Sequence, residues 1–172
     1  MAGAKGRSAM RTKLTSRNQR VELLRGVALF SSCSGRELEK IASLTTEYAA
    51  QVGQVLTEEG TAGLEFFVVI EGEAVASRRG VFLASLGPGS FFGELALLDG
   101  GPRVATVVAE TDMKVLVLSR QEFKNLNFML PSVCHKMLLE LGARLRDTDE
   151  RLSRMASERP AVVAGDYGSS SL

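Results

Sequence analysis

The chain has 172 residues, of which 45% are hydrophobic and 24% are charged, and its formal net charge is +1. These values are typical of a soluble globular protein with one domain and appendages, and no stretch approaches the roughly 20 consecutive apolar residues of a membrane helix. The two cysteines, Cys33 and Cys134, are far apart and follow no metal-ligand pattern. The sequence therefore predicts neither a disulfide framework nor a metal site, and it fits a reducing cytoplasm.

The charge is unevenly distributed along the chain. The first 20 residues hold six basic side chains and no acid, so the other 152 carry 15 basic and 20 acidic groups, a net charge of −5. A short basic arm can attract phosphate or acidic partners. Because the arm lacks apolar periodicity and the apolar core of a signal peptide, we favour a disordered leader. We therefore expect a basic disordered tail over 1–17, one domain over 18–156 and a Pro/Gly/Ser-rich disordered tail over 157–172.

Two helices are predicted before the first strand. Residues 18–29 fit a helix with Val21, Leu24 and Leu29 inward. Ser34 is a suitable cap for a second helix, because Glu37 follows three residues later, as in a capping box. The apolar stripe of that helix consists of Leu38, Ile41 and Leu44.

From Glu47 to Leu118 the chain consists of short apolar runs with glycines between or beside them. The runs are Gln54–Thr57, Phe66–Ile70, Ala74–Ala76, Val81–Leu86, Val104–Ala109 and Lys114–Leu118. Many short strands with glycine turns are typical of a β-sandwich or barrel. The absence of long helical patterns between the runs argues against a parallel α/β sheet.

After Ser119 the pattern becomes helical again. Ser119–Leu126 predicts a short helix with Phe123 inward, and Pro131 suits the first turn of a longer one. The longer helix carries a heptad seam with one polar position, formed by Cys134, Leu138, Leu141, Leu145, Thr148, Leu152 and Met155. Two interpretations are open: the seam packs on its own barrel as a lid, or it pairs with a second copy of the chain.

The segment Phe91–Thr106 differs from the other runs because it combines a short helical stretch, a flexible turn and an arginine before the next strand. Residues 93–98 suit a helix of about one and a half turns, and a flexible turn and Pro102 separate them from Arg103 and a resumed strand. A helix start after glycine favours an anion, and the planar donor fork of Arg103 suits phosphate oxygens. Glu94 can accept hydrogen bonds from sugar hydroxyls, so the pair suits a ribose phosphate. A simple salt bridge between Glu94 and Arg103 is the alternative.

The runs FGELALL (92–98) and PRVAT (102–106) resemble the signature of the cyclic-nucleotide-binding domain family. Protein kinase regulatory subunits, the catabolite activator protein and cyclic-nucleotide-gated channels share this domain. Further similarity lies in 27–31, 53–60, 66–72 and 118–123, so the resemblance covers roughly residues 20–155. It implies a mainly β fold with flanking helices: an eight-stranded jelly roll with N-terminal helices, a short cassette helix and a long C-terminal helix.

The resemblance also implies a ligand site, the phosphate-binding cassette. Its residues here are Gly93, Glu94, Leu95, Ala96, Arg103, Val104, Ala105 and Thr106. Glu94 is implied to accept the ribose 2′-hydroxyl, and Arg103 to pair with the cyclic phosphate, helped by backbone amides at Ala96 and near 104–105. Family members that favour cGMP commonly have threonine after the arginine. Val104 stands there instead, which favours cAMP over cGMP, although Thr106 lies nearby.

The expected role is a cAMP-binding regulatory sensor in the cytoplasm that acts through an effector protein. Leu97 matches the residue that couples the cassette to the moving C-terminal helices, whereas the base-capping residue stays open among Leu141, Arg144 and Leu145. No cofactor, membrane or catalysis is expected, and too few residues follow Met155 for a DNA recognition helix. The alternatives are a nucleotide-independent interaction module and, less favoured, a cyclic-phosphodiester hydrolase with Glu94 as a lone base.

Overall fold

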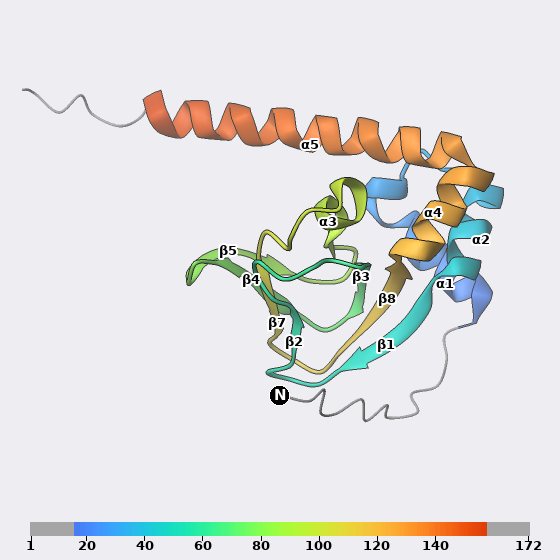
Figure 1. The fold of residues 1–172 in the computed structure, drawn as a ribbon, viewed down its shortest axis with the longest axis horizontal. Helices are drawn as coiled ribbons and strands as arrows, with labels where there is room; N and C mark the ends of the chain where they lie inside the picture. Colours follow the sequence, from blue (N-terminus) through green and yellow to red (C-terminus); the bar gives the residue numbers. More distant parts are fainter. Residues whose placement is uncertain (1–15, 158–172) are drawn as a thin grey trace, which may run out of the picture.

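The computed structural model of the chain describes residues 16–157, and the expected tails fall largely on 1–15 and 158–172, outside the described residues. Within that range eight strands form two four-stranded antiparallel sheets, with helices on one side (Figure 1). The helices are α1 (Arg17–Arg25), η1 (Ala28–Phe30), α2 (Gly35–Leu44), α3 (Glu94–Asp99), α4 (Arg120–Met129) and α5 (Pro131–Ser157). The strands are β1 (Thr46–Ala50), β2 (Val55–Thr57), β3 (Glu65–Glu71), β4 (Ala74–Arg78), β5 (Val81–Leu86), β6 (Phe91–Phe92), β7 (Thr106–Ala109) and β8 (Met113–Ser119).

The two sheets have the strand orders β1-β8-β3-β6 and β2-β7-β4-β5, which is the connectivity of a jelly roll. The expected eight-stranded jelly roll with flanking helices is therefore confirmed. Strand β3 is buried on both faces: Phe66 and Val68 pack toward the helices, whereas Phe67 and Val69 pack between the sheets. A strand covered on both faces needs a continuous apolar run, which explains the sequence FFVVI.

Each of the first two helices begins after a serine cap, although the first was predicted to begin one residue later, at Asn18. Ser16 caps α1 and Ser34 caps α2, each with a complete capping box. The predicted single helix over 18–29 is wrong, because α1 stops at Arg25 and Gly26 caps its end. A separate 3-10 turn, η1, follows over Ala28–Phe30. Its side chain Leu29 is nevertheless buried as expected.

The sequence-based prediction omitted two strands and placed several strand boundaries one or two residues away from their positions in the structure. The predicted runs omitted β1, whose side chains are mostly half-exposed, and β6, which has only two residues. Strand β7 begins at Thr106 rather than at Val104. The reason is that Arg103 already exchanges backbone hydrogen bonds of 2.8 Å with Gly60 and Thr61, and the chain bends at 104–105 before it joins the sheet.

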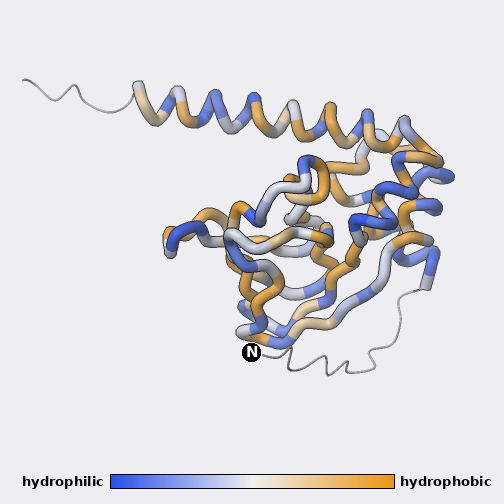
Figure 2. Tube along the Cα trace, viewed as in Figure 1, coloured by the Kyte–Doolittle hydropathy of each residue, from blue (hydrophilic) through white to orange (hydrophobic). Residues whose placement is uncertain are grey.

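Helix α5 begins at Pro131, as predicted, and crosses the top of the molecule above α3 (Figure 1). Its first turns pack on the other helices through Val133 and Met137, each 0% exposed, and Leu141 packs beside them. Figure 2 shows that apolar positions nevertheless recur along the rest of the helix. Its outer half therefore carries an apolar face away from the helical core.

The predicted heptad seam is only partly buried within one chain. Cys134 and Leu141 pack against the helical core, but Leu138, Leu145 and Leu152 are 58%, 62% and 58% exposed. Met155 is 66% exposed. Most of the seam therefore does not pack on the barrel of the same chain. The fully buried residues of α5, Val133 and Met137, lie outside the seam positions.

Candidate functional site

The cassette lies between β6 and β7, and glycine determines its entry. Gly93 caps α3 with a φ of 84°, in the left-handed region where glycine is favoured. A Cβ at this position would collide with Nη1 of Arg103 and would lie 2.8 Å from the carbonyl oxygen of Glu65. Glycine is therefore required here both for its backbone conformation and for the space that it leaves to the arginine.

Arg103 is the best-defined side chain of the site, and it is only 5% exposed. Its Nη1 donates a hydrogen bond of 3.2 Å to the carbonyl oxygen of Gly93. Its Nη2 lies 3.6 Å from Oε2 of Glu65 on β3. The guanidinium carbon lies 5.6 Å from the centre of the Phe67 ring, a cation–π contact. A buried guanidinium with several fixed contacts is pre-oriented for an anion.

The charge of Arg103 is held in a partly desolvated setting. Burial lowers the pKa of its guanidinium, whereas the nearby carboxylates of Glu65 and then Glu94 raise it. The ion pair given by the geometry is with Glu65, a residue that the sequence analysis did not select. Glu65 lies 38 positions before Arg103, so only the folded structure brings the two together.

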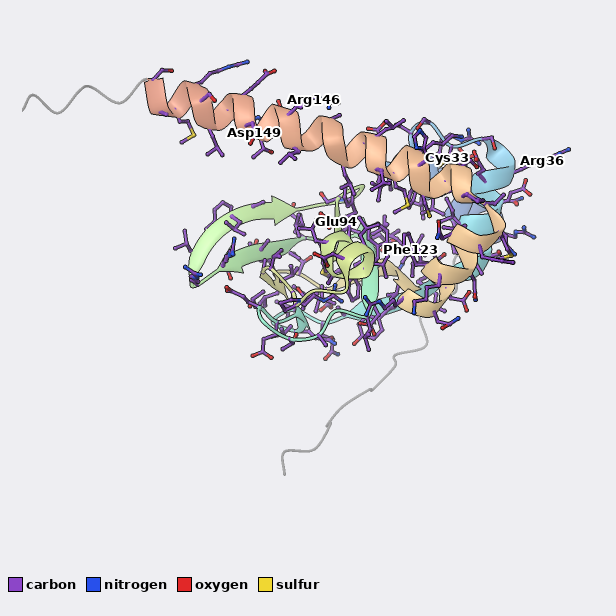
Figure 3. All side chains as sticks on the ribbon, turned by 45° about the horizontal axis from the view of Figure 1, so that its top comes forward. Cys33, Arg36, Glu94, Phe123, Arg146 and Asp149 are labelled. Carbon is purple, nitrogen blue, oxygen red and sulfur yellow. The ribbon has the colours of Figure 1, made fainter. Side chains whose placement is uncertain are left out.

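Glu94 is the first residue of α3, and Figure 3 shows it in the layer between α5 and the strands. Helix α3 has only six residues, so its dipole is small and the buried arginine is the stronger anion-binding group. Ala96 on the same helix is 2% exposed and packs toward Arg103 through Gly63. The Glu94 carboxylate lies near enough to Arg103 to raise the pKa of the guanidinium, so the fold brings these two residues together.

The remaining predicted residues surround this centre. Leu95 and Val104 are 45% and 48% exposed, so each presents apolar surface at the rim. Ala105 and Thr106 are half-buried. The Thr106 hydroxyl accepts a hydrogen bond of 3.0 Å from the backbone amide of Glu59, so it already has a structural partner. Among the base-capping candidates Leu141 is half-buried and Leu145 is exposed.

Gly63 is a second glycine that the site requires, and in the sequence it is one of many glycines that lie between the apolar runs. A Cβ there would collide with the Cβ of Ala96 and would lie 3.0 Å from Nε of Arg103. Its role is close packing rather than an unusual backbone conformation. Its position two residues before the buried strand β3 was the available signal, but that signal does not identify a partner.

Leu97 connects the cassette to the C-terminal helices. It is 3% exposed and belongs to the buried cluster that includes Phe123 and Leu126 of α4 and Val133 and Met137 of α5. The buried cluster that contains Leu97 therefore also contains side chains of α4 and α5.

Two cavities flank the site. One, of about 240 Å³, opens between β1, β2 and β3, and Glu65 and Phe67 are part of its lining. The other, of about 520 Å³, lies between α5 and the barrel, where Glu140 and Ala143 face Ser85, Leu86 and Phe91.

Among residues 16–157 no group of His, Cys, Asp and Glu is arranged to hold a metal ion. In the same described part of the chain, no helix is long and apolar enough to span a bilayer.

Comparisons with known proteins identify relatives of this architecture. A family profile described as the cyclic nucleotide-binding domain matches residues 49–127. A cAMP-dependent protein kinase regulatory subunit of Aspergillus fumigatus is 44% identical over 105 residues, which are 60% of this chain and 25% of that subunit. The Cyclic AMP receptor protein of Thermus thermophilus is 31% identical over 140 residues, which are 78% of this chain and 65% of the receptor.

A solved structure extends the comparison to three dimensions. The regulatory domain of Toxoplasma gondii PKA, crystallised with cAMP, is similar with a TM-score of 0.66 and 30% identity, over 74% of this chain and 49% of that chain. The matched part of this chain spans less than two thirds of the length of each of these three proteins.

Proposed function

Because the chain belongs to the cyclic nucleotide-binding domain family, we propose that it is a regulatory sensor domain that binds cAMP in the cassette over 92–106. The observation that carries this proposal is the buried guanidinium of Arg103, which two glycines accommodate beside the carboxylate of Glu94. The two relatives described above are named as a regulatory subunit and a receptor protein. We therefore also propose that the domain senses its ligand without turning it over.

The two charged groups of the site suit the two polar parts of the ligand. Arg103 is assigned to the cyclic phosphate, since guanidinium–phosphate pairs are strong and directional. Glu94 is assigned to the ribose 2′-hydroxyl as a hydrogen-bond acceptor. Val104 is half-exposed at the rim and has no hydroxyl to offer a guanine base. This favours adenine, so cAMP is the proposed ligand and cGMP the weaker one.

Ligand binding is proposed to move the C-terminal helices. Arg103 and Ala96 are almost fully covered, so we expect α3 to shift when a phosphate reaches the guanidinium. Leu97 transmits such a shift into the cluster shared with α4 and α5. The cavity of about 520 Å³ beneath α5 gives this helix space to approach the barrel. An effector protein is then expected to recognise the changed position of α4 and α5.

A second copy of the chain is the proposed partner of the outer half of α5. Leu138, Leu145 and Leu152 recur every seven residues and are each more than half exposed. Two ion pairs lie within the helix beside these leucines, Arg151 with Asp147 at 2.9 Å and Arg154 with Glu150 at 3.4 Å. The helix therefore offers a neutral apolar seam with heptad spacing, which is self-complementary in a two-stranded coiled coil. We expect a homodimer of this kind in the cytoplasm.

A calorimetric titration of the purified chain with cAMP and cGMP tests the proposed function. We expect saturable cAMP binding and an affinity for cGMP that is weaker by about tenfold, since the hydrogen bond to guanine is missing. Absence of heat and of amide shifts with either nucleotide at micromolar protein contradicts the proposal. That result favours the nucleotide-independent interaction module instead.

A further inference from the structure

Glu65 is the carboxylate that pairs with Arg103 in the structure, with 3.6 Å between Oε2 and Nη2. We propose that it is a resident counter-ion that the cyclic phosphate must displace, and that its negative charge weakens the affinity of this site for cAMP. The inference rests on the proposed function, because it concerns the same arginine. It assigns to Glu65 a role in setting affinity rather than in binding the nucleotide.

The geometry places Glu65 against the anion-binding edge of the site. Its Oε2 lies 3.6 Å from Nη2 of Arg103, while Nη1 is engaged by the carbonyl oxygen of Gly93. The Glu65 side chain is 44% exposed, whereas that of Arg103 is 5% exposed. The more exposed partner of this ion pair is therefore the glutamate, and the buried partner is the arginine.

The fold gives Glu65 a place to move. Its side chain lines the cavity of about 240 Å³ between β1, β2 and β3, together with polar groups of Thr46, Tyr48 and Gln54. When a phosphate takes the guanidinium, the carboxylate can turn into this open space without disturbing the buried strand. Because its backbone stays in β3, opposite Ser119 of β8, the charge remains near the bound phosphate.

The direction of the effect follows from the charges. The displaced carboxylate and the phosphate that replaces it are both negative and lie near the same guanidinium, so they repel each other. Solvent screens this repulsion, because Glu65 is partly exposed. We therefore expect a penalty on cAMP affinity of about 3- to 10-fold. Removal of the carboxylate charge is expected to tighten binding by that factor.

The test compares wild type with Glu65→Gln, and with Glu65→Ala as a smaller second variant. We expect both variants to bind cAMP about 3- to 10-fold more tightly in calorimetry at low salt, with a smaller gain at 0.5 M salt. Glu71→Gln is the matched control: it removes a carboxylate from the other end of β3, where Glu71 pairs with Lys114 at 2.9 Å and is 60% exposed. The control is expected to bind cAMP as wild type does.

A thermal unfolding series separates this role from a purely structural one. Without ligand, Glu65→Gln is expected to melt below wild type, because Arg103 loses its partner. With saturating cAMP, its increase in melting temperature is expected to exceed that of wild type. Equal or weaker cAMP binding by the Glu65 variants overturns the inference while the proposed function stands. Failure of wild type itself to bind cAMP overturns both.

Discussion

Glu37 on α2 accepts a hydrogen bond from Lys136 on α5, with 2.7 Å between Oε2 and Nζ. The same carboxylate accepts hydrogen bonds of 2.7 Å from the backbone amide of Ser34 and from the hydroxyl of Ser132. It therefore caps one helix while it anchors the first turn of another. This network attaches the first turns of α5 to α2. We therefore expect α5 to rotate about its N-terminal end if it moves.

The anchor predicts an acid-sensitive stability. The hydrogen bond from Lys136, followed by that from the Ser34 amide, lowers the pKa of Glu37 from 4.5 to about 2, against burial, which raises it. The folded pKa lies below the unfolded one, so the stabilisation is complete above about pH 4.5 and is lost as the pH falls toward 2. We expect Glu37→Gln to lower the free energy of unfolding by about 2 to 3 kcal/mol at pH 7.

Urea denaturation at a series of pH values measures this difference. The gap between wild type and Glu37→Gln is expected to narrow steadily below pH 4.5. Glu39→Gln is the control, since Glu39 lies on the same helix, is 59% exposed and pairs only loosely with Arg17 at 4.0 Å. A gap that stays constant down to pH 2.5 is incompatible with the anchor.

Gly63→Ala tests the close packing behind the guanidinium. The added methyl group collides with Ala96 and crowds Nε of Arg103, so α3 or the arginine must shift. We expect a loss of about 1 to 3 kcal/mol in stability and a weaker affinity for cAMP. Gly87→Ala is the matched control, because a Cβ there meets nothing within 4 Å. Identical unfolding curves and cAMP titrations for the two variants argue against this packing.

Leu97→Ala tests the path from the cassette to the C-terminal helices. Truncation of this buried side chain is expected to cost about 2 to 4 kcal/mol and to leave a gap between α3 and the cluster of α4 and α5. Hydrogen exchange with and without cAMP reports the response of α4 and α5. We expect a smaller cAMP-dependent change in the variant and its recovery in Leu97→Met. An undiminished response in Leu97→Ala means that coupling follows another route.

Leu145→Glu tests whether α5 pairs with a second copy of the chain. A charge in the middle of the seam is expected to convert the dimer to a monomer without unfolding the domain, because Leu145 is 62% exposed in the single chain. Sedimentation equilibrium gives the mass. Leu139→Glu, on the same helix at 58% exposure but outside the heptad positions, is expected to remain dimeric. A monomeric wild type, or equal effects of the two variants, contradicts the proposed seam.

Local chemistry made much of this fold predictable. The cap of α2 at Ser34 is predictable from Glu37, which follows it by three residues. The cap of α1 at Ser16 was not predicted, and the helix begins one residue earlier than expected. The apolar run of β3 and the first turn of α5 at Pro131 are also encoded by their own residues. The cassette is predicted from its glycine, carboxylate and arginine, which lie within 15 residues, together with the resemblance of FGELALL and PRVAT to a family signature.

The features that escaped prediction depend on tertiary contacts. Glu65 reaches Arg103 only after β3 and the cassette are folded together, and Gly63 differs from any turn glycine only by what its missing Cβ would touch. The alternating pattern of β1 is weak because one of its ends is exposed and its middle is half-exposed. The offset of the α5 seam from the buried Val133 and Met137 depends on how the helix is seated on α4 and η1.

The affinity of Arg103→Ala for cAMP tests the central claim most directly. Arg78→Ala is the matched control, since Arg78 is 55% exposed and lies 3.9 Å from Glu59 at the surface. Calorimetry is expected to give a cAMP dissociation constant about 100- to 3,000-fold above wild type for Arg103→Ala, since a buried charge partner is lost, and an unchanged constant for Arg78→Ala. A folded Arg103→Ala protein that binds cAMP as tightly as wild type contradicts the assignment of this arginine to the phosphate.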